Sequence, residues 1–154
     1  MKTILTSTTL RTTYEFESAH ALPRLADGHK CKRVHGHNFK LTVAVSGQVD
    51  PESGMLLDYA DLDAVVEQHV IGELDHRLLN EVPGLENPTS ENIAEWIWTK
   101  IVKQFLAFPR LYPQFNRVKT LIVGVSESAR YESTFTMDIN YYLELEAETL
   151  VQGA

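Results

Sequence analysis

Three histidines in the first quarter of the chain have the residue type and spacing of a metal site. His35 and His37 are separated by a single glycine, and His20 precedes them by one loop. Neutral imidazole is a good zinc ligand, and two histidines one residue apart at the start of a strand project to the same side. Three protein nitrogens leave a fourth position open for water or a substrate oxygen. The pattern therefore predicts a catalytic zinc site at His20, His35 and His37.

Two simpler interpretations of these histidines stay open at this point. They could be ordinary loop and strand-end residues, or Cys31 could supply a fourth ligand and close a structural zinc site. Cys31 lies beside Lys30, Lys32 and Arg33, and nearby cations favour the thiolate form of cysteine. This setting predicts a reactive thiol that serves as a general base, although a basic loop can also carry a cysteine with no role.

Two further positions have residue types suited to proton transfer or ligand binding. Asp75 directly precedes His76, and a carboxylate next to an imidazole orients the ring and stabilises its charged form. Glu127 ends a predicted strand on its apolar face, where a carboxylate needs a partner and could hold an amino-pyrimidine edge through paired hydrogen bonds. Solvated side chains at a loop and at a hairpin end are the respective alternatives.

Alternating polar and apolar residues predict the strands that position the histidines. Residues 13–20 alternate and end at His20 on the apolar face, and residues 37–45 alternate and begin at His37 on the apolar face. Residues 21–36 form the predicted loop between them. A hairpin is predicted for 118–127 and 131–139, and weaker alternation through 141–146 predicts a longer last strand.

Two helices are predicted between these pairs of strands. Asp58 is a suitable cap for a helix with apolar residues at helical spacing that ends near Gly72. Thr89 is a suitable cap for a second helix that Pro109 limits.

The order ββααββ predicts an α+β fold with a four-stranded antiparallel sheet and two helices on one face. We expect a single domain over residues 1–154, with a core at about 13–139 and a C-terminal extension at 140–154. Four strands leave two exposed edges, and exposed edges favour pairing with another subunit.

Composition indicates the class of partner. The 154 residues contain 14 Lys and Arg against 21 Asp and Glu, so the chain repels phosphate backbones and we expect no nucleic-acid binding. One cysteine forms no internal disulfide, the apolar run in the first ten residues is too short for a secretory signal, and no stretch is long enough to span a bilayer. We expect a cytoplasmic protein that acts on a small molecule and does not bind a membrane.

Several ordered segments together resemble the 6-pyruvoyl-tetrahydropterin synthase family. They are Glu15-Phe16-Glu17-Ser18-Ala19-His20, Cys31-Lys32-Arg33-Val34-His35-Gly36-His37, Leu74-Asp75-His76 and Glu86-Asn87-Pro88-Thr89-Ser90-Glu91. The gap of three residues between Cys31 and His35 resembles the bacterial 6-carboxytetrahydropterin synthases of queuosine biosynthesis. Residues after Glu127 and from 140 onward do not match the shorter bacterial forms.

The resemblance implies a role for each candidate residue. Zinc is bound by His20, His35 and His37, and the catalytic residues are Cys31, Asp75 and His76. The pterin is held by Glu127, with Thr89 and Ser90 near the same ring. It also implies the tunnelling fold, in which two trimers stack as a homohexamer and the sites lie between subunits.

The reaction implied is the zinc-dependent conversion of 7,8-dihydroneopterin triphosphate to 6-carboxy-5,6,7,8-tetrahydropterin, with release of acetaldehyde and triphosphate. The enzyme would be a carbon-oxygen and carbon-carbon lyase in 7-deazapurine synthesis. A pyruvoyl-forming synthase and a non-catalytic pterin-binding module are the alternatives, and the presence of Cys31, Asp75 and His76 together argues against the latter.

Overall fold

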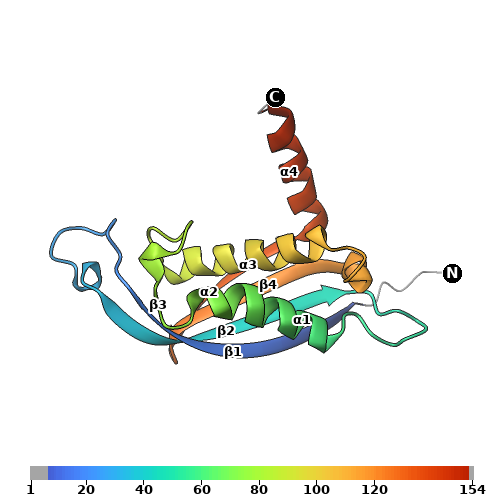
Figure 1. Ribbon diagram of the computed structural model, residues 1–154, viewed down its shortest axis with the longest axis horizontal. Coiled ribbons are helices and arrows are strands. Elements are labelled where there is room, and N and C mark those ends of the chain that lie inside the picture. The colour runs from blue at the N-terminus through green and yellow to red at the C-terminus, as the bar shows by residue number, and fades with distance from the viewer. Residues whose placement is uncertain (1–6, 153–154) are drawn as a thin grey trace.

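The computed structural model describes residues 7–152, and the remaining ends of the expected domain, 1–6 and 153–154, lie outside the described residues. The described part is an α+β fold built on one curved sheet, with helices lying along one face (Figure 1). No helix among residues 7–152 is both long and apolar enough to cross a membrane.

The sheet has five strands in the order β3-β1-β2-β4-β5. Four of them are long and pair antiparallel: β1 (Thr8–His20), β2 (His35–Gly47), β4 (Val118–Ser128) and β5 (Tyr131–Asp138). The fifth, β3 (Arg77–Leu78), pairs parallel with Ser18 and Ala19 of β1. The prediction of a four-stranded antiparallel sheet is therefore wrong, because a strand of two residues is too short to have a detectable alternation.

Two helical regions cover the apolar face of the sheet. The first consists of α1 (Tyr59–Val66), the π-helical segment η2 (Glu67–Ile71) and α2 (Gly72–Leu74), and it begins at the predicted cap Asp58. The second is α3 (Ser90–Ala107), which begins after the predicted cap Thr89 and ends before Pro109. Short 3-10 turns occupy η1 (Lys30–Lys32), η3 (Leu79–Glu81) and η4 (Pro113–Arg117).

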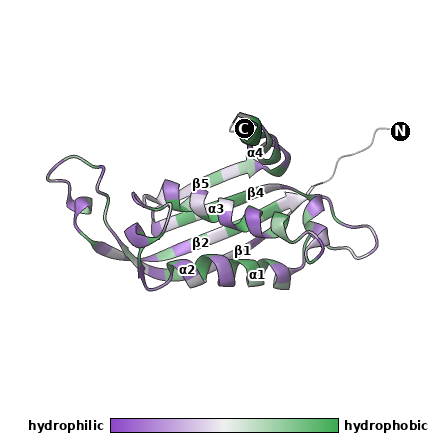
Figure 2. Ribbon diagram, turned by 45° about the horizontal axis from the view of Figure 1, so that its top comes forward, coloured by the Kyte–Doolittle hydropathy of each residue, from purple (hydrophilic) through white to green (hydrophobic). Residues whose placement is uncertain are grey.

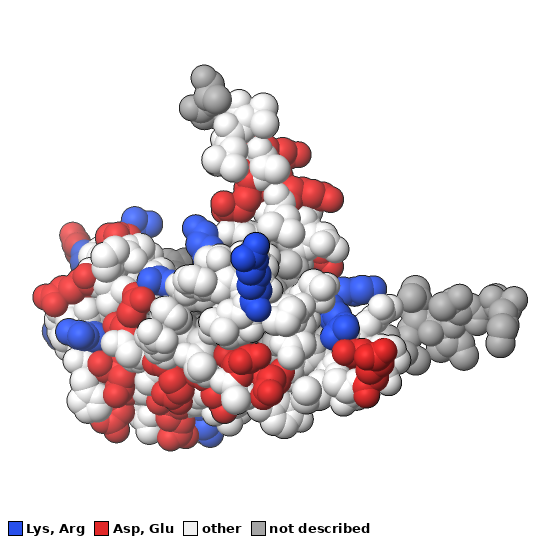
Figure 3. Space-filling model, turned by 45° about the vertical axis from the view of Figure 1, so that its right-hand side comes forward, with Lys and Arg blue, Asp and Glu red and all other residues white. Residues whose placement is uncertain are grey.

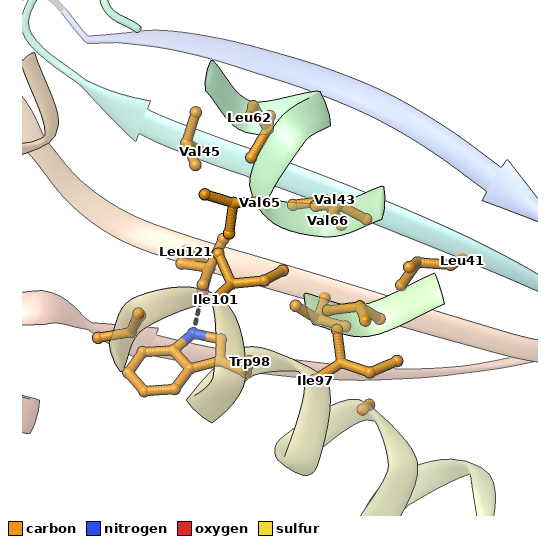
Figure 4. Packing of buried hydrophobic residues seen from close by; sticks show 14 of the residues in the cluster. Leu41, Val43, Val45, Leu62, Val65, Val66, Ile97, Trp98, Ile101 and Leu121 are labelled. Atoms are coloured by element: carbon orange, nitrogen blue, oxygen red, sulfur yellow. Dashed lines mark hydrogen bonds between the residues drawn. The ribbon is translucent and has the colours of Figure 1, made fainter. Parts of the chain in front are cut away.

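The core lies between these helices and the sheet, where apolar residues of β2 and β4 face α1 and α3 (Figure 4). Trp98 is at the centre, and its indole N–H donates a hydrogen bond to the carbonyl of Leu121 at 2.8 Å. This bond satisfies the polar end of a side chain that is otherwise buried among hydrocarbons. Polar residues lie on the outer sides of the helices (Figure 2).

The C-terminal residues form a helix, α4 (Ile139–Gln152), where a longer last strand was predicted. Asp138 explains the change, because its carboxylate accepts hydrogen bonds from the N–H groups of Asn140 at 2.9 Å and Tyr141 at 3.2 Å. A carboxylate that caps two free N–H groups starts a helix, and the Leu, Glu and Ala residues that follow favour its continuation. The helix points away from the rest of the molecule (Figure 1).

The pairing register between β1 and β2 brings the three histidines together. His20 lies opposite His35, and Ser18 lies opposite His37. Cross-strand partners share one face of a sheet, so all three imidazoles project on the helix-covered face. Phe16 and Phe39 stack next to them with ring centroids 4.9 Å apart, which places the histidines at the end of the hydrophobic core.

Candidate metal centre

The three predicted histidines form a compact cluster. Their potential ligand nitrogens all lie within 4.8 Å of one another. The ring centroids are 4.5 Å apart for His20 and His35, and 5.1 Å apart for each of the other two pairs. Spacings of this size place three nitrogens around one point, as a metal ion requires.

Backbone carbonyls fix the orientation of two of these rings. The Nδ1 atom of His20 lies 2.7 Å from the carbonyl of Pro88, and the Nδ1 atom of His35 lies 2.8 Å from the carbonyl of Arg33. Because a carbonyl only accepts hydrogen bonds, each Nδ1 carries the proton and each Nε2 of the neutral ring keeps a free lone pair. This is the tautomer in which Nε2 binds a metal.

Two ring nitrogens without hydrogen-bond partners also indicate that the cluster can bind a metal. The Nε2 atoms of His20 and His37 are buried and have no hydrogen-bond partner within residues 7–152. A buried polar atom with no partner is costly, and a coordinated cation would remove that cost. The residues present therefore fit a bound metal ion.

Burial lowers the pKa of His20, outweighing the hydrogen bond to Pro88 and the charge of Glu127, which both raise it. A lowered pKa keeps the ring neutral at pH 7. Neutral imidazole is the metal-binding form, so the environment of His20 favours coordination.

Glu127, which the resemblance associates with the pterin, lies beside this cluster. Its two carboxylate oxygens are 3.9 Å from the Nε2 atoms of His20 and His37, respectively. Both distances exceed a hydrogen bond. The carboxylate comes from the end of β4 and is partly exposed, so it adds negative charge beside the cluster and remains accessible.

Cys31 lies in η1, within the loop that joins β1 to β2. The loop is held by a hydrogen bond from the N–H of Leu22 to the carbonyl of Cys31 at 2.8 Å, and the N–H of Cys31 donates to Nδ1 of His29 at 3.1 Å. The thiol is half-buried and is not a member of the histidine cluster. Of the neighbouring cations, Lys32 forms an ion pair with Asp27 at 2.5 Å.

Asp75 and His76 form a hydrogen-bonded pair, with 2.9 Å between Oδ2 and Nδ1. The pair is anchored to β1: the N–H of Glu17 donates to Asp75 at 2.9 Å, and the N–H of His76 donates to the carbonyl of Glu17 at 2.7 Å. The hydrogen bond from the Glu17 N–H, with the His76 side chain second, lowers the pKa of Asp75. A backbone φ of 56° at His76, which is uncommon for a residue with a side chain, turns the chain at this point.

One open hollow is lined by one residue of the pair and one of the cluster. It has a volume of about 590 Å³, and both His37 and His76 line it together with Glu17 and Ser18 of β1. Within a single chain the structure therefore brings the proton-transfer candidate to the same surface as one of the metal-binding candidates.

Thr89 is the N-cap of α3 and Ser90 is its first residue, and both hydroxyl groups form hydrogen bonds within the fold. The hydroxyl of Thr89 caps the helix by accepting from the N–H of Asn92 at 3.3 Å, and the hydroxyl of Ser90 bonds that of Ser133 on β5 at 2.7 Å. The preceding residue is Pro88, whose carbonyl orients His20. The start of α3 therefore lies beside the histidine cluster.

Sequence reasoning missed several groups that support the site. The carbonyls of Arg33 and Pro88 are backbone atoms and leave no signature in residue type. Asn80 holds the segment after His20 by accepting from the N–H of Ala21 and donating to its carbonyl, both at 2.8 Å. An asparagine in a turn is too common to signal such a role.

The match to a known family covers the sheet and the helices packed on it, but not α4. Residues 9–138 match the family model described as 6-pyruvoyl tetrahydropterin synthase. The chain belongs to this family. The match includes the three histidines, the Asp75-His76 pair and Glu127, and it ends one residue before α4.

Several relatives carry different names. A protein of Archaeoglobus fulgidus, named provisionally as a 6-carboxy-5,6,7,8-tetrahydropterin synthase, is 44% identical over 105 residues, which is 68% of this chain and 84% of the relative. The 6-carboxy-5,6,7,8-tetrahydropterin synthase of Synechocystis is 44% identical over 57% of this chain and 70% of its own. The dihydroneopterin monophosphate aldolase of Pyrococcus furiosus is 41% identical over 57% of this chain and 69% of its own.

Among solved structures, the 6-pyruvoyl tetrahydropterin synthase of Caenorhabditis elegans superposes with a TM-score of 0.69 at 26% identity. The superposition covers 86% of this chain and 97% of the other. The chain therefore shares its fold with that enzyme over nearly the full length of the enzyme.

Proposed function

We propose that this protein is a zinc-dependent 6-carboxytetrahydropterin synthase of queuosine (7-deazapurine) biosynthesis. It would convert 7,8-dihydroneopterin triphosphate to 6-carboxy-5,6,7,8-tetrahydropterin, releasing acetaldehyde and triphosphate. The observation that carries the proposal is the convergence of three imidazoles, two of them with buried and unpaired Nε2 atoms. His76, which is hydrogen-bonded to Asp75, lines the same hollow as His37.

The choice of the carboxy product has two supports. Cys31 is separated from His35 by three residues, as in the bacterial enzymes that the sequence resembles. Relatives named for this product are 44% identical to the chain.

Nitrogens of His20, His35 and His37 would hold the zinc ion. When bound, it would act as a Lewis acid toward oxygens of the substrate side chain. The Cys31 thiolate would remove a proton from an adjacent carbon of the substrate. His76, oriented through Nδ1 by the carboxylate of Asp75, would return protons to the product.

Glu127 would hold the pterin through paired hydrogen bonds, since its carboxylate is accessible beside the cluster. Thr89 and Ser90 would lie near the same ring, because the start of α3 adjoins the carbonyl that orients His20.

We also propose that the active form is a homohexamer made of two trimers. The edges of the sheet support an oligomer. β3 pairs only with Ser18 and Ala19, so Thr8–Glu17 of β1 has no strand on its outer side within residues 7–152. The outer edge of β5 is likewise unpaired in the described chain. Long unpaired edges favour pairing with further copies.

One experiment tests substrate, product and metal together. Purified protein, stripped of metal and reloaded with zinc, is incubated with dihydroneopterin triphosphate while acetaldehyde and the pterin product are measured. We expect stoichiometric acetaldehyde and 6-carboxytetrahydropterin only after reloading. A pyruvoyl product would instead indicate a pyruvoyl-forming synthase, and binding without turnover would indicate a pterin-binding module.

A further inference from the structure

Helix α4 leaves the molecule with an apolar stripe that nothing in residues 7–152 covers. Leu143, Ala147 and Leu150 recur at spacings of four and three residues, so they share one side of the helix, and Val151 lies beside them. Leu150 is 75% exposed and Val151 is 80% exposed. Figure 1 shows the helix standing clear of the sheet, and the colours of Figure 2 show hydrophobic residues in it.

Acidic residues flank this stripe. Glu144 and Glu148 lie on one side of it and Glu146 on the other, and α4 contains no Lys or Arg. Figure 3 shows acidic atoms on both flanks of the projecting helix with uncharged surface between them. An amphipathic helix of this kind is suited to an apolar groove with a neutral or basic rim.

The same chain contains such a groove at the base of α4. It has a volume of about 370 Å³ between the end of α3, η4 and the first turn of α4, and its lining includes Phe105, Tyr112 and Phe115 but no charged residue. Two exposed apolar residues directly precede its lining residues Pro109 and Tyr112 in the chain: Phe108 at 53% and Leu111 at 63% exposure. Arg110 lies between these two in sequence and has no ion-pair partner in the described part of the chain.

The helix cannot fill the groove of its own chain. Leu143 already lines the groove, and α4 runs outward from that point. At about 1.5 Å per residue, Leu150 lies roughly 10 Å further along the axis. The exposed end of α4 is therefore available only to another molecule.

We propose that α4 docks into the groove formed by α3, η4 and the base of α4 on a second copy of this chain. One chain carries both the acidic amphipathic helix and the apolar groove with Arg110 beside it, so two copies complement each other reciprocally in a closed pair. Pairing of two α4 helices with each other is disfavoured, because each carries three glutamates and no cation. The contact uses no residue of the histidine cluster, and α4 itself lies outside the family match, which ends at residue 138.

Cross-linking between two single-cysteine variants tests this contact. The one native thiol is removed by Cys31→Ser in the full chain, and Leu111→Cys and Leu150→Cys are introduced separately. The two proteins are mixed and treated with a short bis-maleimide. We expect a covalent heterodimer from the mixture and little product from either variant alone. Leu145→Cys, on the opposite side of α4, replaces Leu150→Cys as the matched control and should give little heterodimer.

A charge-reversal variant provides a second test of this contact. Arg110→Glu, added to the Leu111→Cys variant, should lower the yield of heterodimer several-fold, because it places a carboxylate beside the acidic flanks of α4. The proposal is overturned if Leu150→Cys alone forms homodimers, which indicates α4-to-α4 pairing. It is also overturned if a chain with both substitutions links only within itself, or if the mixture forms no heterodimer.

Discussion

At the histidine cluster, backbone carbonyls decide which ring nitrogen is left free to bind a metal. Pro88 and Arg33 accept from the Nδ1 atoms of His20 and His35, which leaves the Nε2 lone pairs free. The sequence located all three rings, because their types and spacing are visible in it. It could not supply the tautomers, because these depend on carbonyls that any residue type would provide.

Two substitutions separate metal binding from proton transfer. We expect His35→Ala to lose zinc on dialysis, since two imidazoles hold the ion far more weakly than three. We expect Cys31→Ala to keep one zinc per chain and lose turnover, because the thiol is not a member of the cluster. Metal analysis of the purified variants, beside an acetaldehyde assay, measures both effects.

His29→Ala is the matched control, because this histidine belongs to the same loop but not to the cluster. It should keep its zinc. Loss of zinc from Cys31→Ala would favour a closed structural site with four ligands, and full zinc content in His35→Ala would remove that residue from the ligand set.

The carboxylate of Asp75 acts through His76 in the proposed mechanism. We expect Asp75→Asn to lower kcat about 100-fold with zinc content unchanged, because an amide cannot stabilise the imidazolium form and general acid-base groups contribute about 10²–10⁴-fold. Steady-state kinetics check this value. In a His76→Ala background the same substitution should cost little more, since the two residues work as one unit. Independent, additive losses would contradict the pairing.

At the scale of elements, α3 depends on Thr89 for its start. We expect Thr89→Ala to lower the free energy of unfolding by about 1 kcal/mol, the usual cost of losing an N-cap hydroxyl, and Thr89→Ser to restore most of it. Chemical unfolding of the metal-free protein measures the change. A raised KM with unchanged stability would instead indicate that the hydroxyl serves the pterin and not the helix.

Elements with a clear repeat were predictable from the sequence. β1 and β2 alternate over enough residues to reveal their buried faces, and the caps at Asp58 and Thr89 have the residue types that start helices. The predicted strand ends were less accurate. β1 begins at Thr8 and β2 at His35, earlier than the predicted 13 and 37, because pairing with a neighbouring strand extends a strand beyond its alternating part.

Two elements gave no reliable signal. The two residues of β3 are too few for a period. The C-terminal segment has apolar residues at 141, 143 and 145 that alternate like a strand, but Asp138 caps the chain there and α4 forms. Glu127 was located correctly at the end of a strand, but its approach to His20 and His37 depends on the β2–β4 register and could not be read from one strand.

At the scale of the whole molecule, the proposed site draws on separated segments. His37 and His76 line one hollow, whereas Cys31 belongs to a loop that extends beyond the end of the sheet (Figure 1). A loop of this kind can reach a neighbouring copy once the open edges of β1 and β5 are paired. We therefore expect a complete site to combine Cys31 of one chain with the Asp75-His76 pair of another.

Mixing two inactive variants tests this sharing. Cys31→Ala and His76→Ala are each expected to be inactive, and after joint unfolding and refolding at equal amounts about a quarter of the sites should hold both intact groups, because each group is intact with a chance of one half in a random symmetric assembly. Acetaldehyde release by the mixture, compared with each variant refolded alone, measures the recovery. If both groups came from one chain, no site could regain its missing partner and the mixture would stay as inactive as its components, so the recovered fraction decides between a shared site and a self-contained one.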